Sequence, residues 1–367
     1  MFKLLSLDGG GIRGLIILHC LAEYEKQYGV RVPDLFNCYS GTSIGAILIG
    51  FFAYLGWSAT EVLDYIEKNR VLEKMMPLSK WDRLLGLFQF QSKYSDSLRR
   101  EELTKLFGDQ TLNSTYQPVL MTGYNLTTNE TIYLTSYGTG QNLSVVDAML
   151  ISSSAPFYFP SIYLDSIDPA VKTALTNSKE STGVCGVDGG LVCNNPSDIM
   201  TMHLMMNVDW NDAVDIRVVS IGTGYVESET DWSRSSNWGL LNWRLIWKLL
   251  TSQVIQNIFN GSAKIAEERC GYLLDIYHRK IRLTENRSNY YLRINAPIDQ
   301  KHLAMDNLSQ KQQEACQNYG IAWAHANFDN LNNLLRGSTP PPLTPCCVPG
   351  GAHLPLSPPA AYPPHPR

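Results

Sequence analysis

The chain has 367 residues, a formal net charge of −4, and 44% hydrophobic against 17% charged residues. A chain of this length can bury a large core without disulfides or metal staples, and its slight acidic excess argues against a nucleic-acid partner. The eight cysteines are scattered without Cys-x-x-Cys spacing. We therefore predict idle thiols, no metal site and no cofactor.

The chain begins with a short β pattern over residues 2–7, which enters a glycine loop at residues 8–14 with the sequence DGGGIRG. An apolar helical pattern follows over residues 15–28. Bare backbone N–H groups at the positive end of a helix attract anions, so we predict that this loop binds a negative group. Because a strand already starts at Phe2, we expect no secretory leader and a cytoplasmic protein.

A second glycine motif, Gly41-Thr42-Ser43-Ile44-Gly45, lies between an apolar run at residues 32–39 and a small-residue apolar run at residues 46–55. This order predicts a strand, a sharp turn and a helix. Such a junction is a nucleophile elbow, in which the two glycines let the strand and helix approach closely. Ser43 is therefore the candidate nucleophile.

The next elements are a helix from an N-cap at Thr60 to about residue 70, a surface helix at 97–107, and a hairpin of strands at 119–124 and 131–135. A helix over 145–151 runs into three serines, which we interpret as end caps. The aromatic segment at 81–90 suits ordinary packing better than a lid over the site.

An acidic residue, Asp188, lies in the turn sequence Val187-Asp188-Gly189-Gly190 after a polar insertion at residues 165–183. It is the candidate base for Ser43. Residues 217–221 predict a strand buried on both faces. The alternation of helical and extended patterns predicts a three-layer α/β/α fold with a central, mainly parallel sheet, which brings both glycine loops to one sheet edge.

These motifs together resemble the patatin-like phospholipase family, especially its bacterial members. The family is similar in its Asp-Gly-Gly-Gly-x-Arg start, its Gly-Thr-Ser-x-Gly elbow and its later Asp-Gly-Gly turn. Residues 152–160, Asn194-Asn195-Pro196, and Tyr291-Leu292-Arg293-Ile294 agree with it as well. The resemblance covers residues 1–335. It implies one phospholipase domain, followed by a proline-rich tail at 336–367 that we predict to be disordered.

The resemblance implies a lipid acyl hydrolase that cleaves carboxylic esters of membrane phospholipids through an acyl-enzyme. Ser43 would be the nucleophile and Asp188 the general base. The oxyanion hole would be formed by Gly9, Gly10 and Gly11, with the Ile44 N–H as a further donor. The remaining motif and anion-binding positions are Arg13, Gly14, Gly41, Gly45, Gly189 and Gly190. Two roles are equally open for Arg13, which could steer a phosphate head group or hold the loop. Asp8 is expected to organise the loop as a hydrogen-bond acceptor rather than to act as a catalyst.

Several alternatives remain open at this stage. A histidine such as His203 would complete a triad. Residues 9–14 also match a dinucleotide-binding pattern, but no acidic residue at a strand end follows about twenty residues on. An acyltransferase of the malonyl-transfer type would carry histidine where Thr42 stands. A non-specific esterase and an effector phospholipase activated by a protein partner or a cyclic nucleotide complete the alternatives.

Contact with the membrane is expected to be peripheral and transient. The longest apolar run, residues 44–57, is shorter than the roughly twenty residues that cross a bilayer. Residues 238–259 combine tryptophans with basic side chains, as interfacial helices do, but an almost uniformly apolar helix is more typical of a buried one.

Overall fold

The computed structural model describes residues 1–76, 92–164, 169–176, 183–207, 214–227, 240–281 and 287–336, except for the side chains of 170, 174, 207 and 240–257. The aromatic segment at 81–90, the side chains of 238–257 and the tail after residue 336 lie outside the described residues. The proposed division between a domain and a disordered tail therefore stays a prediction.

Strands and helices are interspersed along the described chain. The strands are β1 (Phe2–Leu7), β2 (Cys38–Gly41), β3 (Val119–Asn125), β4 (Glu130–Thr135), β5 (Ile162–Leu164), β6 (Val184–Asp188), β7 (Ile216–Ile221) and β8 (Tyr291–Ile294). The helices are α1 (Gly14–Tyr28), α2 (Val32–Leu35), α3 (Ile44–Leu55), α4 (Ala59–Asn69), α5 (Val71–Met75), α7 (Asp96–Phe107), α8 (Val145–Ser152), α9 (Pro169–Thr176), α10 (Ser197–Asn207), α12 (Leu240–Lys280) and α13 (Gln310–Arg336). Short 3₁₀ turns include η1 (Gly11–Arg13) and η3 (Gly189–Leu191).

The strands form one sheet in the order β5-β6-β3-β2-β1-β7-β8, with β4 paired to β3 outside this path. The pairings that join β3, β2, β1, β7 and β8 are all parallel. The pairings of β3 with β4, β3 with β6 and β5 with β6 are antiparallel. The sheet is therefore mixed, with the predicted parallel part at its centre.

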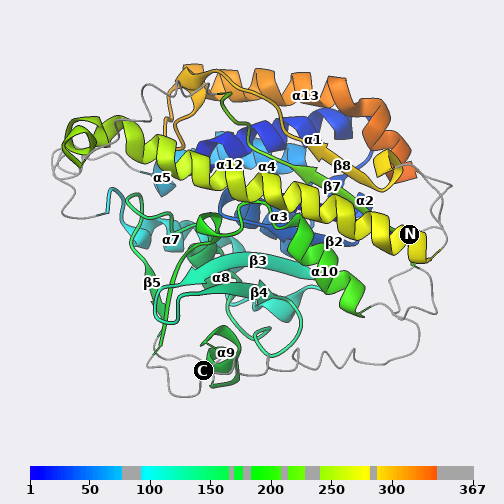
Figure 1. Cartoon of the computed structure of the whole chain (residues 1–367), viewed down its shortest axis with the longest axis horizontal. Coiled ribbons are helices and arrows are strands. Elements are labelled where there is room, and N and C mark those ends of the chain that lie inside the picture. The colour runs from blue at the N-terminus through cyan, green and yellow to red at the C-terminus, as the bar shows by residue number, and fades with distance from the viewer. Residues whose placement is uncertain are drawn as a thin grey trace.

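Helices cover both faces of this sheet (Figure 1). In β1, Leu5 and Leu7 pack into the core that α1, α3, α8 and α13 complete, whereas Leu4 packs into the core formed with α10 and α12. Successive side chains of a strand point to opposite faces, so this division defines two apolar layers on either side of the sheet. The predicted three-layer α/β/α architecture is confirmed.

Two local predictions are wrong. The apolar run before the elbow is not one strand, because Val32–Leu35 forms the short helix α2 with Pro33 in its first turn. Proline lacks the N–H that a sheet ladder requires. Helix α4 is capped by Ser58 rather than Thr60: Ser58 and Glu61 form a capping box, while Thr60 donates hydrogen bonds to Glu25.

Among the described residues, no single helix is long and apolar enough to cross a membrane. The pair α3 and α4 passes that test together by length and composition only, and the two helices are bent by 112°. The described cysteines at 20, 38, 185, 193, 270 and 316 are all free, as predicted for idle thiols.

Candidate active site

Ser43 occupies a sharp turn between β2 and α3. Its φ of 56° and ψ of −122° are a combination that residues other than glycine rarely adopt. A methyl group on Gly41 would lie 2.5 Å from the carbonyl carbon of Gly45, and one on Gly45 would lie 2.3 Å from the Leu7 oxygen. The two glycines are therefore needed for the closure of strand onto helix, and the backbone has the geometry of a nucleophile elbow.

Asp188 ends β6 close to the strand that supports Ser43. It pairs with Gly123 of β3, and the same strand pairs Met121 with Gly41 of β2. The Asp188 side chain is fully buried, and its Oδ1 accepts a hydrogen bond of 2.7 Å from the Gly190 N–H. The carboxyl group also interacts with the Ser43 hydroxyl, although Oδ2 receives no hydrogen bond of normal geometry from the described part of the chain.

The electrostatic setting of Asp188 suits a base. Burial raises the pKa of Asp188 to about 6, even though the Ser43 hydroxyl, the Gly190 N–H and the more distant Arg99 cation each lower it. A carboxylate at its usual pKa near 4 is a poor proton acceptor at neutral pH. The raised pKa brings Asp188 closer to the working range of a general base.

The end of α8 connects the two candidate residues. The Ser152 hydroxyl accepts a hydrogen bond of 3.0 Å from the Ser43 N–H, and the Ser154 carbonyl accepts one of 3.0 Å from the Asp188 N–H. These serines thus do more than cap the helix. They fix the backbone of the nucleophile and the acid relative to each other.

A buried arginine of α7 holds this serine segment. The side chain of Arg99 is 2% exposed, donates to the Ser153 carbonyl at 2.8 Å and to the Ser154 hydroxyl at 3.0 Å, and is paired with Asp96. Its guanidinium also lies 3.7 Å from the centre of the Phe159 ring. The helix α7, predicted to lie at the surface, therefore buries the Arg99 cation against the serine segment 152–154.

The glycine loop after β1 lies against the elbow. A methyl group on Gly9 would lie 3.0 Å from the Ser43 Cβ. The Gly9 N–H donates to the Asn194 carbonyl at 3.3 Å, whereas the N–H groups of Gly10, Gly11 and Ile44 have no partner within the described part of the chain. These three N–H groups thus remain free to donate within that part of the chain, whereas the Gly9 N–H is already used and Gly9 contacts the elbow closely.

Two charged side chains hold the loop in place. Arg13 is 2% exposed and donates to the carbonyls of Gly10 and Gly224, at 3.3 and 2.9 Å. These contacts favour the loop-holding role over phosphate steering. Asp8 forms a buried ion pair with both terminal nitrogens of Arg293, in agreement with its expected role as an organising acceptor.

The remaining motif glycines mark close contacts. A methyl group on Gly14 would lie 2.5 Å from Ile44, one on Gly189 would lie 2.2 Å from Thr122, and one on Gly190 would lie 2.9 Å from Phe259.

The Asn194-Asn195 pair ties the Asp188 loop to α12, because the Asn195 amide donates to the Ala263 carbonyl at 3.4 Å.

The described histidines make their contacts away from the site. The Nδ1 of His203 lies 3.0 Å from the Tyr137 hydroxyl, His278 contacts the Ile216 carbonyl, and His302 contacts Gln312. His19 packs at Gly320, and His325 contacts Glu23. Within the described residues, the geometry thus gives Ser43 a carboxylate neighbour and no histidine neighbour.

Sequence reasoning missed four residues around the site: Arg99, Ser152, Asn194 and Arg293. The serine run and the residues around Asn194 and Arg293 were visible as motifs, but a role for each side chain was not. Arg99 gave no signal, because an arginine in a charged helical pattern is normally exposed.

A comparison with protein families adds the decisive observation. The family model described as patatin-like phospholipase matches residues 5–201, which include the glycine loop, the elbow and Asp188. The chain belongs to the patatin-like phospholipase family. This result confirms the resemblance noted in the sequence.

Individual patatin-like relatives come from plants and bacteria. Patatin-like protein 4 of Arabidopsis thaliana is 26% identical over 366 residues, covering 90% of this chain and 85% of the relative. A cGAMP-activated phospholipase of Vibrio cholerae is 30% identical over 244 residues, covering 60% of this chain and 64% of the relative. The crystal structure of VipD from Legionella pneumophila matches with a TM-score of 0.45 and 12% identity, covering 89% of this chain and 66% of that chain.

Proposed function

We propose that this patatin-like protein is a lipid acyl hydrolase that cleaves the carboxylic ester bonds of phospholipids through Ser43 and Asp188. The observation that supports this most is the placement of a fully buried carboxylate, with a pKa raised to about 6, beside a serine on a strained elbow. A base and a nucleophile in this arrangement serve acyl transfer.

In the first half-reaction, the Ser43 Oγ forms a bond to the ester carbonyl carbon, and its proton passes to the Asp188 carboxylate. The resulting oxyanion accepts hydrogen bonds from the N–H groups of Gly10 and Gly11, with the Ile44 N–H as a third donor. Each donor in such a hole lowers the barrier by about 3 to 4 kcal/mol. The C–O bond then breaks, and the alcohol leaves with the proton from Asp188.

In the second half-reaction, Asp188 accepts a proton from water, whose oxygen attacks the acyl-enzyme carbonyl. The fatty acid leaves, and the proton returns to Ser43. The Ser152 hydroxyl and the Ser154 carbonyl hold the two reacting residues through both steps. Access to the lipid is proposed to be through transient contact with the membrane surface.

The test is release of free fatty acid from phospholipid vesicles and of alcohol from a soluble short-chain ester. Wild type should cleave both, whereas Ser43→Ala and Asp188→Asn should cleave neither while remaining folded by circular dichroism. Retained hydrolysis in Ser43→Ala would disprove the assignment. Cleavage of the soluble ester alone, both with and without an activating nucleotide, would replace the phospholipase with a non-specific esterase.

An activated phospholipase is the second candidate. It is favoured by the relative from Vibrio cholerae, whose name states that it is a cGAMP-activated phospholipase. Adding cyclic GMP-AMP to the vesicle assay decides between the two. Constitutive wild-type activity supports the first candidate, and activity that appears only with the nucleotide supports the second.

A further inference from the structure

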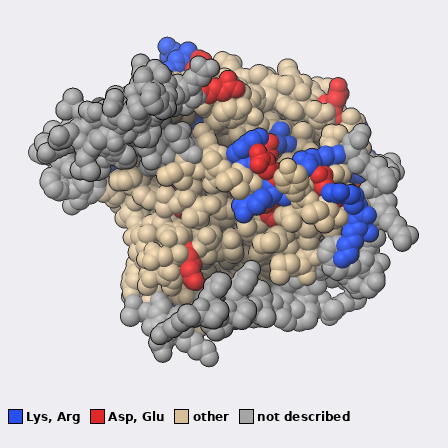
Figure 2. Space-filling view, in the orientation of Figure 1, with Lys and Arg blue, Asp and Glu red and all other residues tan. Residues whose placement is uncertain are grey.

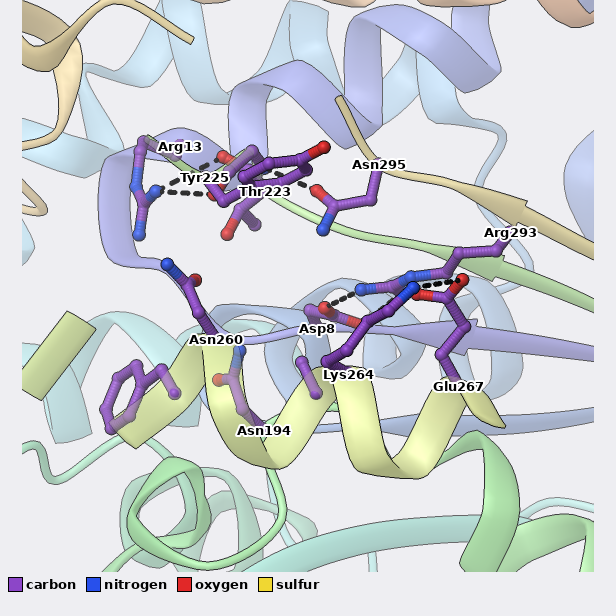
Figure 3. A pocket seen from close by; sticks show the side chains of 13 residues that line it. Asp8, Arg13, Asn194, Thr223, Tyr225, Asn260, Lys264, Glu267, Arg293 and Asn295 are labelled. Atoms are coloured by element: carbon purple, nitrogen blue, oxygen red, sulfur yellow. Dashed lines mark hydrogen bonds and ion pairs between the residues drawn. The ribbon is translucent and has the colours of Figure 1, made fainter. Parts of the chain in front are cut away.

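A polar pocket of about 390 Å³ lies at the glycine loop, where Asp8, Arg13 and Asn194 line it (Figure 3), and neither Ser43 nor Asp188 is among its lining residues. Its walls come from residues that end or follow β1, β7 and β8, from Asn194, and from residues 259–267 of α12. The carboxyl ends of neighbouring parallel strands are where α/β folds bind ligands. The volume lies within the lower range of small-molecule sites.

Two buried polar atoms of this pocket have no hydrogen-bond partner among the described residues. They are the Oδ1 of Asn194, a residue that is 5% exposed, and the Nε of Arg293, whose side chain is 7% exposed. Buried polar groups are nearly always hydrogen-bonded, and each one left alone costs about 1 to 3 kcal/mol. An occupant that satisfies both atoms must offer a donor and an acceptor.

The pocket carries more positive than negative charge. Its cations are Arg13, Lys264 and Arg293, and its acids are Asp8 and Glu267. Asp8 and Arg293 neutralise each other, which leaves Arg13 and Lys264 against Glu267 alone. Lys264 is 63% exposed and lies 3.3 Å from Glu267, and a surface pair of this kind is weak, so Lys264 can turn to a ligand at little cost. The complementary ligand is therefore an anion.

The side chains of the pocket also hold the loop that presents the oxyanion donors. The Thr223 hydroxyl donates to the Gly9 carbonyl at 2.8 Å, and the Arg13 Nε donates to the Gly10 carbonyl at 3.3 Å. The backbone carbonyl of Asn194 also accepts the Gly9 N–H. A ligand in contact with these side chains is coupled to the position of the Gly10 and Gly11 N–H groups.

We propose that this pocket binds a small phosphate ester and that its occupancy adjusts the oxyanion loop. The phosphate oxygens would accept from Lys264 and the Arg293 Nε, and a hydroxyl of the ester would donate to the Asn194 Oδ1. A phosphate group supplies several acceptor oxygens together with the required negative charge. The ester is either a free nucleotide or the headgroup of a phospholipid. The effect on the oxyanion loop rests on the proposed function.

Binding is measured first, by isothermal titration calorimetry with the full chain carrying Ser43→Ala, so that hydrolysis plays no part. The probes are adenosine monophosphate, cyclic GMP-AMP and glycerophosphoethanolamine, with inorganic sulfate as a plain anion. At least one phosphate ester should bind more tightly than sulfate. Lys264→Glu should weaken that binding by at least about tenfold, because it reverses the charge at the rim.

The matched control is Arg279→Glu, an equal change of charge at an exposed position of the same helix outside the pocket. It should leave binding unchanged. Equal weakening by both variants would mean attraction to the net charge alone and would overturn the proposal. So would the failure of every phosphate ester to bind at millimolar concentration.

Hydrolysis assays then show whether the phosphate belongs to a nucleotide or to a lipid headgroup. They also show whether binding in the pocket changes the rate of hydrolysis. A nucleotide that binds should change kcat of the wild type but not of Lys264→Glu. Binding of glycerophosphoethanolamine alone, with inhibition of vesicle hydrolysis, assigns the phosphate to the lipid headgroup. Binding of any of these without an effect on either reaction contradicts the coupling. If wild type hydrolyses nothing, the proposed function fails while the binding result still stands.

Discussion

At the scale of the single residue, the chemistry depends on the ionisation of Asp188. The folded protein keeps this carboxyl group away from water and gives it one firm hydrogen bond, from the Gly190 N–H. Burial favours the neutral acid and outweighs the hydrogen bond, which favours the carboxylate. The same burial that makes Asp188 a stronger base therefore makes its charged form costly to the fold.

The first prediction concerns the pH dependence of activity. Asp188 accepts a proton only when it is ionised, so kcat/KM should fall as the pH drops through about 6. The measurement is hydrolysis of a soluble ester from mildly acidic to mildly alkaline pH, with circular dichroism to exclude unfolding. A rate that stays flat through this range would contradict a carboxylate base with a raised pKa.

The second prediction concerns stability. Because the folded pKa of Asp188 lies about two units above its reference value, the loss of its proton destabilises the fold progressively between about pH 4 and 6, and fully above that. Asp188→Asn should be inactive yet about 2 to 3 kcal/mol more stable than wild type at pH 8. The difference should vanish below about pH 4. Urea unfolding at both pH values measures it, and a less stable variant at pH 8 would refute the interpretation.

At the scale of elements, the end of α8 and the inner face of α7 form the support of the site. Ser152 and Ser154 contact the backbones of Ser43 and Asp188, and Arg99 contacts Ser153 and Ser154. The arginine thus acts on the catalytic pair through the serine segment and through its charge. It is a positioning residue rather than a catalytic one.

The third prediction compares variants of this arginine. Arg99→Met should lower kcat by about tenfold to a hundredfold and move the acid limb of the pH profile upward, because both the clamp and the cation are lost. Arg99→Lys keeps the charge, so its kcat should fall while the limb stays in place. Arg100→Met removes a half-exposed neighbouring cation that pairs with Asp147 and contacts neither Ser153 nor Ser154, so it is the control and should change neither. Identical pH profiles for the Met and Lys variants would deny the electrostatic part of the role.

Some elements follow from local sequence and others do not. The elbow helix α3 and the hairpin of β3 and β4 were predictable, because apolar pattern and turn residues are local signals. The apolar run that contains α2 resembles a strand, and only Pro33 within it indicates otherwise. The burial of Arg99 depends on α8 and Phe159, which are distant in sequence and leave no periodic signal.

At the scale of the whole molecule, the mixed sheet assembles the site from distant parts of the chain. The register of β1 with β2 and β7 places the glycine loop beside the elbow. The antiparallel pairing of β6 with β3 places Asp188 at the site. The expected mainly parallel sheet did not predict this antiparallel pairing. The sequence thus predicted the candidate pair and its edge of the sheet, but the contacts between loops require the folded topology.

The surface and the interior of the molecule use charge differently. Lys and Arg side chains alternate with acidic ones on the face that α12 crosses, where Arg269 pairs with Asp198 and Arg287 with Asp275 (Figure 2). The Arg269–Asp198 pair joins an exposed cation to a buried carboxylate, whereas the Arg287–Asp275 pair is the more exposed of the two and contributes little to stability. The Asp8–Arg293 pair is buried instead, and it joins the loop after β1 to β8.

The fourth prediction follows from this contrast. Arg293→Met should lower the free energy of unfolding by about 3 to 5 kcal/mol, because it leaves the Asp8 carboxylate buried without a partner. Arg287→Met, which removes a half-exposed cation, should cost less than about 1 kcal/mol. Chemical denaturation of both variants provides the comparison. Equal losses in the free energy of unfolding would show that the buried pair stabilises the fold no more than the exposed pair does.

The most direct test of the central claim is to locate the nucleophile by covalent labelling. Wild type, Ser43→Ala and Asp188→Asn are treated with a fluorophosphonate, and the modified peptide is identified by mass spectrometry. We predict a single adduct on Ser43 in the wild type, none in Ser43→Ala and strongly slowed labelling in Asp188→Asn. An adduct on another serine, or labelling of Ser43 at an undiminished rate without Asp188, would contradict the proposed pair.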